Sequence, residues 1–193
     1  MKELLLLFTV ILLSGANAQN ITNNAMKTIF KYSDPAAVDK LTTALNKDTT
    51  TAAQIKRVTS WIDKNLVKMG AKVPKGAIEG NKTAMVKYVT GFLNSRASLT
   101  KLVNKLFDAV KTVVPTAKAT EMKKLLWKID KETNNDLPKT ESEFDKRVVP
   151  IIPKDKQSAV FSKLVSTKKD FLTKNPQDAK NLQWTFKGST SSG

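Results

Sequence analysis

The chain has 193 residues and a formal net charge of +16, and it contains neither cysteine nor histidine. These two absences exclude disulfide frameworks, Cys/His zinc sites, imidazole-based switches and the Ser-His-Asp and Cys-His nucleophile systems. The fold must therefore be stabilised by packing, which a chain of this length can provide.

The first 18 residues are typical of a secretory signal peptide. Lys2 precedes an apolar run over residues 4–13, and Ala16-Asn17-Ala18 then forms a cleavage pattern. The run is too short to cross a bilayer, and no later segment is apolar for long enough. We therefore expect a secreted, extracellular protein in which residues 19–187 form one helical domain and residues 188–193 a flexible tail.

The remaining sequence predicts an all-α fold, because apolar residues recur with helical spacing and no segment alternates as a strand does. Asp34 and Pro35 open one helix, and Thr51 with Gln54 matches a capping box that opens the next. Residues 71–80 are expected to form a long loop. Helices are expected over residues 23–32, 35–46, 51–69, 83–96, 98–114, 116–131, 141–148 and 154–175, with a last short one near Leu182.

The clearest helical signal is the stretch from Ser98 to Val114, which Pro115 ends. Its apolar residues share one face, and Asn104, Asp108 and the lysines hold the other. Such a face can dock on sister helices, on a hydrophobic ligand or on a membrane surface. Sister helices are the economical choice, because at least four other predicted helices carry matching faces.

Three residues are candidates for binding a hydrophobic ligand. Lys168 falls between apolar residues on its helix face, and Arg96 extends the apolar stripe that includes Tyr88. A fatty-acid carboxylate at a pocket mouth would need such a cation, and arginine can bind it bidentately. The alternative is that both cations place their stems on the core and their charged ends in water.

The segment from residue 130 to residue 141 has the spacing of a calcium-binding EF-hand loop. Asn135 stands where that loop normally has glycine. The alternative is a polar interhelix loop followed by a second capping box, and any metal held here should be weakly bound Mg²⁺ rather than Ca²⁺. The candidate metal ligands are Asp130, Glu132, Asn134, Asp136 and Glu141.

Glycosylation sequons begin at Asn20 and at Asn81, in agreement with the expected secretory route.

The basic residues comprise Arg57, Arg96, Arg147 and 30 lysines. Such an excess attracts anionic lipids, acidic glycans or nucleic acid. The lysines are spread over every predicted helix, and arginine is scarce, so nucleic acid is disfavoured as a partner. No feature of the sequence fixes an oligomeric state.

An enzymatic function has little support in the sequence. The acidic residues Glu141 and Glu143 occupy alternate positions of a predicted helix, so their side chains do not face one another as an acid/base pair would.

Residues 46–70 resemble the SXP/RAL family of secreted nematode proteins. The shared features are Asn46, Thr50-Thr51 with Gln54 opening a helix, Val58 three residues before Trp61, and a closing Gly70. Ile62 stands where the family usually has alanine, and Gly70 comes later than usual. The resemblance implies an all-helical secreted protein that binds divalent ions or small ligands.

Taken together, these patterns predict a secreted, non-enzymatic binding protein whose cargo is a small hydrophobic ligand such as a fatty acid. No cofactor is expected apart from the weakly bound divalent cation. The alternatives are a cationic protein that associates with anionic membranes or glycans, and a secreted antigen that binds a divalent cation weakly.

Overall fold

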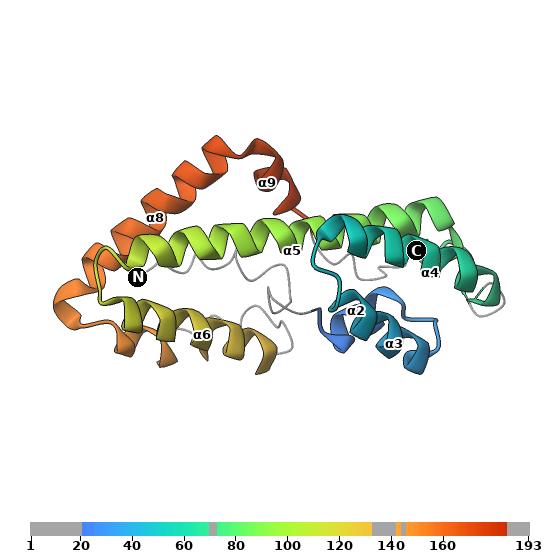
Figure 1. The fold of residues 1–193 in the computed structure, drawn as a ribbon, viewed down its shortest axis with the longest axis horizontal. Helices are drawn as coiled ribbons and strands as arrows, with labels where there is room; N and C mark the ends of the chain where they lie inside the picture. The colour runs from blue at the N-terminus through green and yellow to red at the C-terminus, as the bar shows by residue number, and fades with distance from the viewer. Residues whose placement is uncertain (1–20, 70–72, 133–141, 144–145, 185–193) are drawn as a thin grey trace. The chain divides into compact units, whose positions relative to one another are not determined.

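The computed structural model describes residues 21–69, 73–132, 142–143 and 146–184, and this part of the chain is all-α, with no strand (Figure 1). The helices are α2 (Asn23–Ile29), α3 (Pro35–Leu45), α4 (Thr51–Met69), α5 (Lys82–Val110), α6 (Thr116–Glu132), α8 (Gln157–Lys174) and α9 (Pro176–Asn181). Short 3₁₀ turns are η2 (Ile78–Gly80), η3 (Val149–Ile151) and η4 (Lys154–Lys156). The predicted fold class is confirmed.

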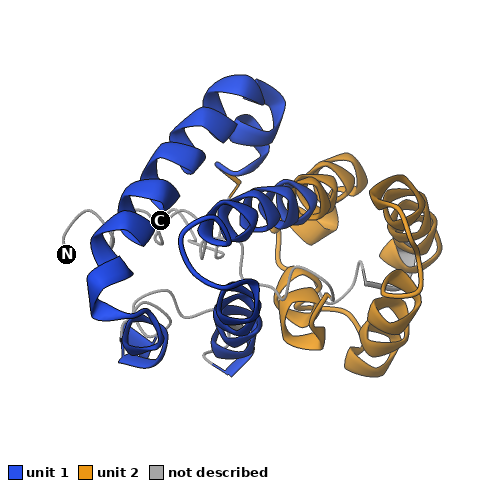
Figure 2. Ribbon diagram, turned by 60° about the vertical axis from the view of Figure 1, so that its left-hand side comes forward, with its two compact units in different colours: residues 1–19, 95–183 blue, residues 20–94, 184–193 orange. Residues whose placement is uncertain are grey.

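The described residues fall into two compact units (Figure 2). Unit 1 is built from residues 95–183, and unit 2 from residues 21–94 together with Trp184. Helix α5 contributes residues to both units. The expected limits of the signal peptide, the domain and the tail all lie outside the described residues, so these limits stay predictions.

Helix α5 is one continuous helix, and the prediction of two helices meeting near residue 97 is wrong. The intervening Arg96-Ala97-Ser98 contains no proline or glycine, and alanine and arginine are strong helix formers. Ser98 could have capped a new helix, but its hydroxyl bonds to Asp178 instead. The helix ends at Val110, before the turn that leads to Pro115.

The helix starts follow side-chain capping, with one shift from expectation. Asp34 caps α3 by accepting from the Ala36 amide at 2.9 Å. The cap of α4 is Thr50, not Thr51, because the Thr50 hydroxyl accepts from the Ala53 amide at 3.2 Å. Gln54 does not complete a capping box, since its side chain donates to the Leu45 carbonyl at 3.0 Å. This amide therefore joins the start of α4 to the end of α3.

The core of unit 1 forms around the predicted apolar face of α5. The face packs in one cluster with residues of α6 and α8. Each of the buried side chains on this face is at most 3% exposed. They are Leu99, Leu102, Val103, Leu106, Phe107 and Val110, and they meet Met122, Leu126 and Ile129 of α6 and Val160, Leu164 and Phe171 of α8. The face therefore docks on sister helices, as its pattern favoured.

The core of unit 2 comes from α2, α3, α4 and the first half of α5. Its buried apolar residues include Met26, Ile29, Phe30, Val38, Leu41, Leu45, Val58, Ile62, Met85, Val89, Phe92 and Leu93. Trp61 packs edge-on against Phe30, with ring centroids 4.8 Å apart. Asn46 ties the segment before α2 to the end of α3, because its side chain accepts from the Ile21 amide at 2.7 Å and donates to the Ile21 carbonyl at 2.9 Å.

The described part of the predicted loop, residues 73–80, contains more order than a loop signal indicates. Gly76 has φ of +89°, a left-handed conformation that favours glycine. Glu79, in the η2 turn, is only 4% exposed, and its carboxylate accepts from the Tyr32 amide at 3.2 Å. Burial raises the pKa of Glu79, although hydrogen bonds from the Tyr32 and Lys31 amides oppose the rise. A buried carboxylate therefore links this segment to the end of α2.

Candidate functional site

The three candidate ligand residues lie on two helices, Tyr88 and Arg96 on α5 and Lys168 on α8. Arg96 belongs to the unit 1 part of α5 and is only 6% exposed, so little of its side chain reaches water, whereas the alternative placed its charged end there. Lys168 is half-buried on α8, and this burial lowers the pKa of its ammonium group. Tyr88 belongs to unit 2 and packs on Trp184, with ring centroids 5.1 Å apart. None of the three lines either of the two surface hollows described below.

Trp184 covers a glycine on α5, a contact that the sequence did not indicate. Its ring also contacts Phe92, at a centroid distance of 5.4 Å. A Cβ added at Gly91 would lie 2.5 Å from Cδ1 of this indole, so only glycine allows the ring to sit so close to the helix. Gly91 is therefore a packing position, even though glycine weakens a helix interior.

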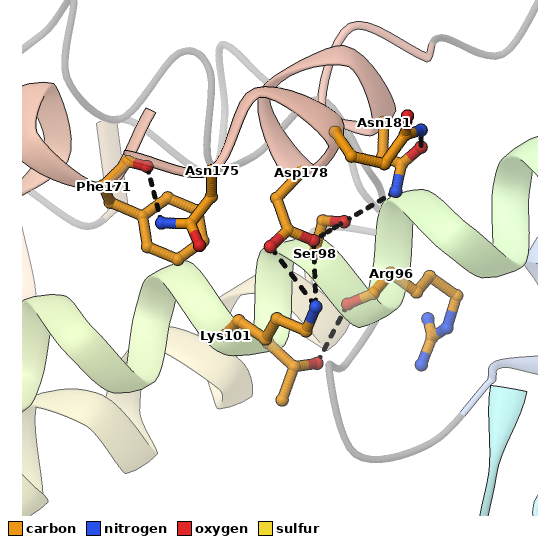
Figure 3. Close-up of polar contacts among 9 residues, drawn as sticks. Arg96, Ser98, Lys101, Phe171, Asn175, Asp178 and Asn181 are labelled. Atoms are coloured by element: carbon orange, nitrogen blue, oxygen red, sulfur yellow. Dashed lines mark hydrogen bonds and ion pairs between the residues drawn. The ribbon is translucent and has the colours of Figure 1, made fainter. Parts of the chain in front are cut away.

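A closed polar cluster, the α5–α9 clamp, joins two helices of unit 1 (Figure 3). It consists of Ser98, Lys101, Asp178 and Asn181. The Ser98 hydroxyl donates to Asp178 Oδ1 at 2.7 Å and accepts from Asn181 Nδ2 at 3.0 Å. Lys101 Nζ lies 3.1 Å and 3.3 Å from the two oxygens of the same carboxylate. The guanidinium of Arg96 points away from this cluster in Figure 3.

The chemistry of the α5–α9 clamp is that of a structural contact. Serine with lysine three residues later is a spacing used by some acyl-transfer enzymes, in which the lysine serves the serine. Here the lysine bonds to the aspartate, and the serine is only 1% exposed and has its hydroxyl engaged as donor and acceptor. The clamp therefore holds α9 on α5.

Most of the predicted metal loop lies outside the described residues. Asn134, Asp136 and Glu141 fall there, and Asp130 and Glu132 lie in the last turn of α6. The carboxylate of Glu132 pairs with Arg147 at 2.6 Å and with Lys128 at 3.8 Å. The hydrogen bond from Arg147 makes the largest contribution to holding the pKa of Glu132 below its usual range. Over residues 21–69, 73–132, 142–143 and 146–184, no group of three or more metal-ligating side chains comes together.

Of the two predicted glycosylation sites, Asn20 lies outside the described residues and Asn81 is exposed. Asn81 Oδ1 accepts from the Ala84 amide at 2.9 Å, and the side chain thereby caps α5. A glycan is attached through the side-chain nitrogen, which this cap does not use. The structure therefore leaves the site available for modification.

A basic hollow, open to solvent, lies between α3 and α4 in unit 2. Its volume is about 510 Å³, and it is lined by Asp39, Lys40, Thr43, Ala44, Lys47 and Arg57. Asp39 is paired with Lys27 at 2.9 Å, which offsets its charge. The residues of α3 that line the hollow recur at a helical spacing of three and four, so they share one face of the helix. This spacing is visible in the sequence, but it lies on the face opposite the apolar stripe.

Arg57 is held in place at the edge of the basic hollow. Its Nε and Nη2 donate to the two carboxylate oxygens of Asp48 at 2.6 Å and 2.8 Å. This contact holds the pKa of Asp48 below its usual range. A guanidinium has five N–H donors, so the bidentate contact leaves others for a further acceptor. No sequence pattern marked the pair, because nine residues and a helix start separate its members.

A second hollow of unit 2, of about 550 Å³, is open to solvent and is formed by the loop before α5. It is lined by Val73, Pro74, Lys75, Gly76, Ala77, Ile78, Gly80, Asn81 and Ala84. Lys75 is its one basic residue, so it lacks the charge of the basic hollow.

Of the two acidic residues considered as an acid/base pair, the structure describes one. Glu141 lies outside the described residues, and Glu143 pairs with Lys146 at 3.0 Å. Within the part of the chain that the structure describes, no helix is long and apolar enough to cross a membrane.

Comparison with known proteins gives no relative: no protein-family model, no curated protein and no solved structure matches the chain. The resemblance of residues 46–70 to the SXP/RAL family stays a prediction. Within that segment, the side chain of Thr50 caps α4. The side chains of Gln54 and Asn46 bond to the backbone of Leu45 and Ile21.

Proposed function

We propose that this chain is a secreted, non-enzymatic helical binding protein that associates through its cationic surface with anionic membranes or glycans. The observation that carries the proposal is the placement of the lysines. Exposed lysines occur on α3, α4, α5, α6, α8 and α9, so the charge excess faces solvent on every one of these helices.

Two further features support this proposal. The apolar face of α5 that could have bound a ligand or membrane is buried against α6 and α8. Ten of the described carboxylates are already ion-paired, so little acidic charge remains to offset the other lysines. Long-range attraction to polyanions follows from such a surface.

The test is binding of the full chain to a sulfated polysaccharide and to vesicles containing anionic phospholipid, at increasing salt. Exposed charges are screened beyond about 8 Å at physiological ionic strength, so affinity should fall steeply as salt rises. No binding at low salt, or binding that salt leaves unchanged, would contradict the proposal.

A hydrophobic ligand such as a fatty acid is a second candidate, favoured by the half-buried Lys168. This cation shares helix α8 with the buried Val160, Leu164 and Phe171, and its pKa is lowered by burial. A carboxylate bound beside it would favour the charged form. Titration of the delipidated protein with a fluorescent fatty-acid probe should then give a saturable blue shift that survives high salt and is weakened in Lys168→Met. Absence of the shift would remove this candidate.

Weak divalent-cation binding by the segment at residues 130–141 is a third proposal, which rests on its sequence spacing. Addition of Mg²⁺ should then change the tryptophan fluorescence spectrum of the protein, and the variant Asp130→Asn should abolish this change.

A further inference from the structure

We propose that the basic hollow between α3 and α4 is the docking site for a sulfate group of an anionic glycan. This assignment rests on the proposed function and adds to it a place and a ligand chemistry. Arg57 is the positioned hydrogen-bond donor, and Lys40 and Lys47 are the flanking charges.

The shape and the charge of the hollow both suit an anionic group. Small-molecule sites typically occupy about 300–1,000 Å³, and the hollow, at about 510 Å³, falls within that range. Three of its six lining residues are basic, and the single acidic one, Asp39, is already paired with Lys27. The second hollow, of similar volume, has Lys75 as its one basic lining residue, whereas here three cations line one concave surface.

Arg57 is already oriented for binding an anion. Asp48 holds the guanidinium from one edge through two hydrogen bonds, so the side chain loses less conformational freedom when it binds a further ligand. The planar fork of arginine matches oxyanions better than a lysine ammonium does. A sulfate ester offers three acceptor oxygens to such a fork.

The surroundings of the hollow favour a glycan over a membrane. Peripheral membrane binding gains much of its strength from apolar side chains that enter the acyl boundary. Among the described residues, the large exposed apolar side chains are Ile78 and Val165, and neither lines the hollow. A hydrophilic, sulfated chain needs no such anchor.

The experiment compares two triple variants of the full chain that have the same net charge. In the hollow variant, Lys40, Lys47 and Arg57 are changed to glutamine. In the control, three exposed lysines of α6 and α8 are changed to glutamine: Lys124, Lys163 and Lys169. Binding of a defined heparin hexasaccharide is measured by calorimetry at low and physiological salt. Loss of several charge-assisted hydrogen bonds should weaken the hollow variant about tenfold or more relative to the control.

A charge-conserving variant, Arg57→Lys, isolates the role of the fork. It should bind the hexasaccharide several-fold more weakly than the wild type, because an ammonium cannot keep the bidentate contact with Asp48 while it donates to the sulfate. Equal affinity of Arg57→Lys and wild type would overturn the role of Arg57. Circular dichroism and thermal unfolding of each variant check that the fold is kept.

The outcomes separate this inference from the proposed function. Equal weakening of the hollow variant and the control would overturn the hollow as a site, while general cationic association would stand. No binding by the wild type at low salt would overturn both. If vesicles containing anionic phospholipid compete for the hexasaccharide and the hollow variant alone loses vesicle binding, the site belongs to lipid phosphate, and the glycan assignment is wrong.

Discussion

Asp178 in unit 1 and Asp48 in unit 2 each hold a basic side chain, but the two groups have opposite characters. Asp178 accepts from Ser98 and Lys101 inside the α5–α9 clamp, where the serine is 1% exposed and its hydroxyl is engaged as donor and acceptor. Asp48 holds only one edge of Arg57, whose side chain is 46% exposed beside the basic hollow. A saturated, buried polar group stabilises a fold, whereas a positioned and exposed cation can still bind an anion.

The largest expected effect on stability comes from opening the α5–α9 clamp. Ser98→Ala removes only the hydroxyl and leaves Asp178 without one donor and Asn181 Nδ2 without its acceptor. Unsatisfied buried polar groups cost about 1–3 kcal/mol, so denaturant unfolding should show a loss in that range. Thr112→Val is the control, because that hydroxyl lies on an exposed turn. A loss no greater than that of the control would show that the clamp contributes little to stability.

A smaller loss is expected at the other closed contact, the Trp184 ring on Gly91. A Cβ at Gly91 would lie 2.5 Å from the indole, and overpacking of this kind typically costs about 1–3 kcal/mol. Alanine improves a helix interior by about 1 kcal/mol over glycine, so Gly91→Ala should destabilise by about 1 kcal/mol net. In a Trp184→Ala background the same change should stabilise instead. A double-mutant cycle of thermal unfolding measures this reversal, and the same sign in both backgrounds would refute the contact.

Glu79 is intermediate between the buried α5–α9 clamp and the exposed Arg57, because its carboxyl group is buried yet can carry a charge. Its pKa is raised by burial, so the folded state binds its proton more tightly than the unfolded state does. Stability from this group is therefore greatest below the usual carboxyl value of 4.5 and falls as pH rises through the raised folded pKa. Glu79→Gln keeps an acceptor for the Tyr32 amide, so it should raise the unfolding temperature at pH 7.

The same variant should lose its advantage over wild type as pH falls below the usual carboxyl value, where Glu79 is itself protonated. Thermal melts at several pH values measure this convergence. Glu121→Gln, on an exposed ion pair of α6, serves as the control. A Glu79→Gln variant that is less stable than wild type at pH 7 would mean that the charged hydrogen bonds outweigh the burial.

The smallest expected change in stability is at Arg57. The Arg57 side chain is 46% exposed and that of Asp48 only 11%, so Arg57→Gln should lower the unfolding midpoint, but only slightly. Binding of the heparin hexasaccharide should nevertheless weaken in this variant. A large loss of stability would mean that Arg57 stabilises the fold as the α5–α9 clamp does. Asp48 and Asp178 would then have the same structural role.

Helical periodicity and capping predicted the fold class, the positions of α3, α4 and α6, and the buried face of α5. The errors arose where tertiary contacts decide. Ser98 resembles a helix start in sequence, but its hydroxyl is used by Asp178, eighty residues away. Thr51 fits a capping box with Gln54, yet Gln54 bonds to the end of α3 instead.

The candidate sites were predicted less well, for the same reason. Lys168 and Arg96 stood out because cations broke an apolar stripe; Lys168 is half-buried and Arg96 is buried, and their role in binding a ligand stays a prediction. The basic hollow depends on α3 and α4 lying side by side, which spacing along one helix does not report.

The cap at Asn81 bears on how an attached glycan could be removed. An amidase that releases N-linked glycans converts the asparagine to aspartate and leaves one side-chain oxygen where Oδ1 now accepts from Ala84. Aspartate is an equally good N-cap, and its charge is favourable at a helix N-terminus. Enzymatic deglycosylation of the native protein should therefore leave α5 capped and mark the former attachment site by a small change in mass and one added negative charge.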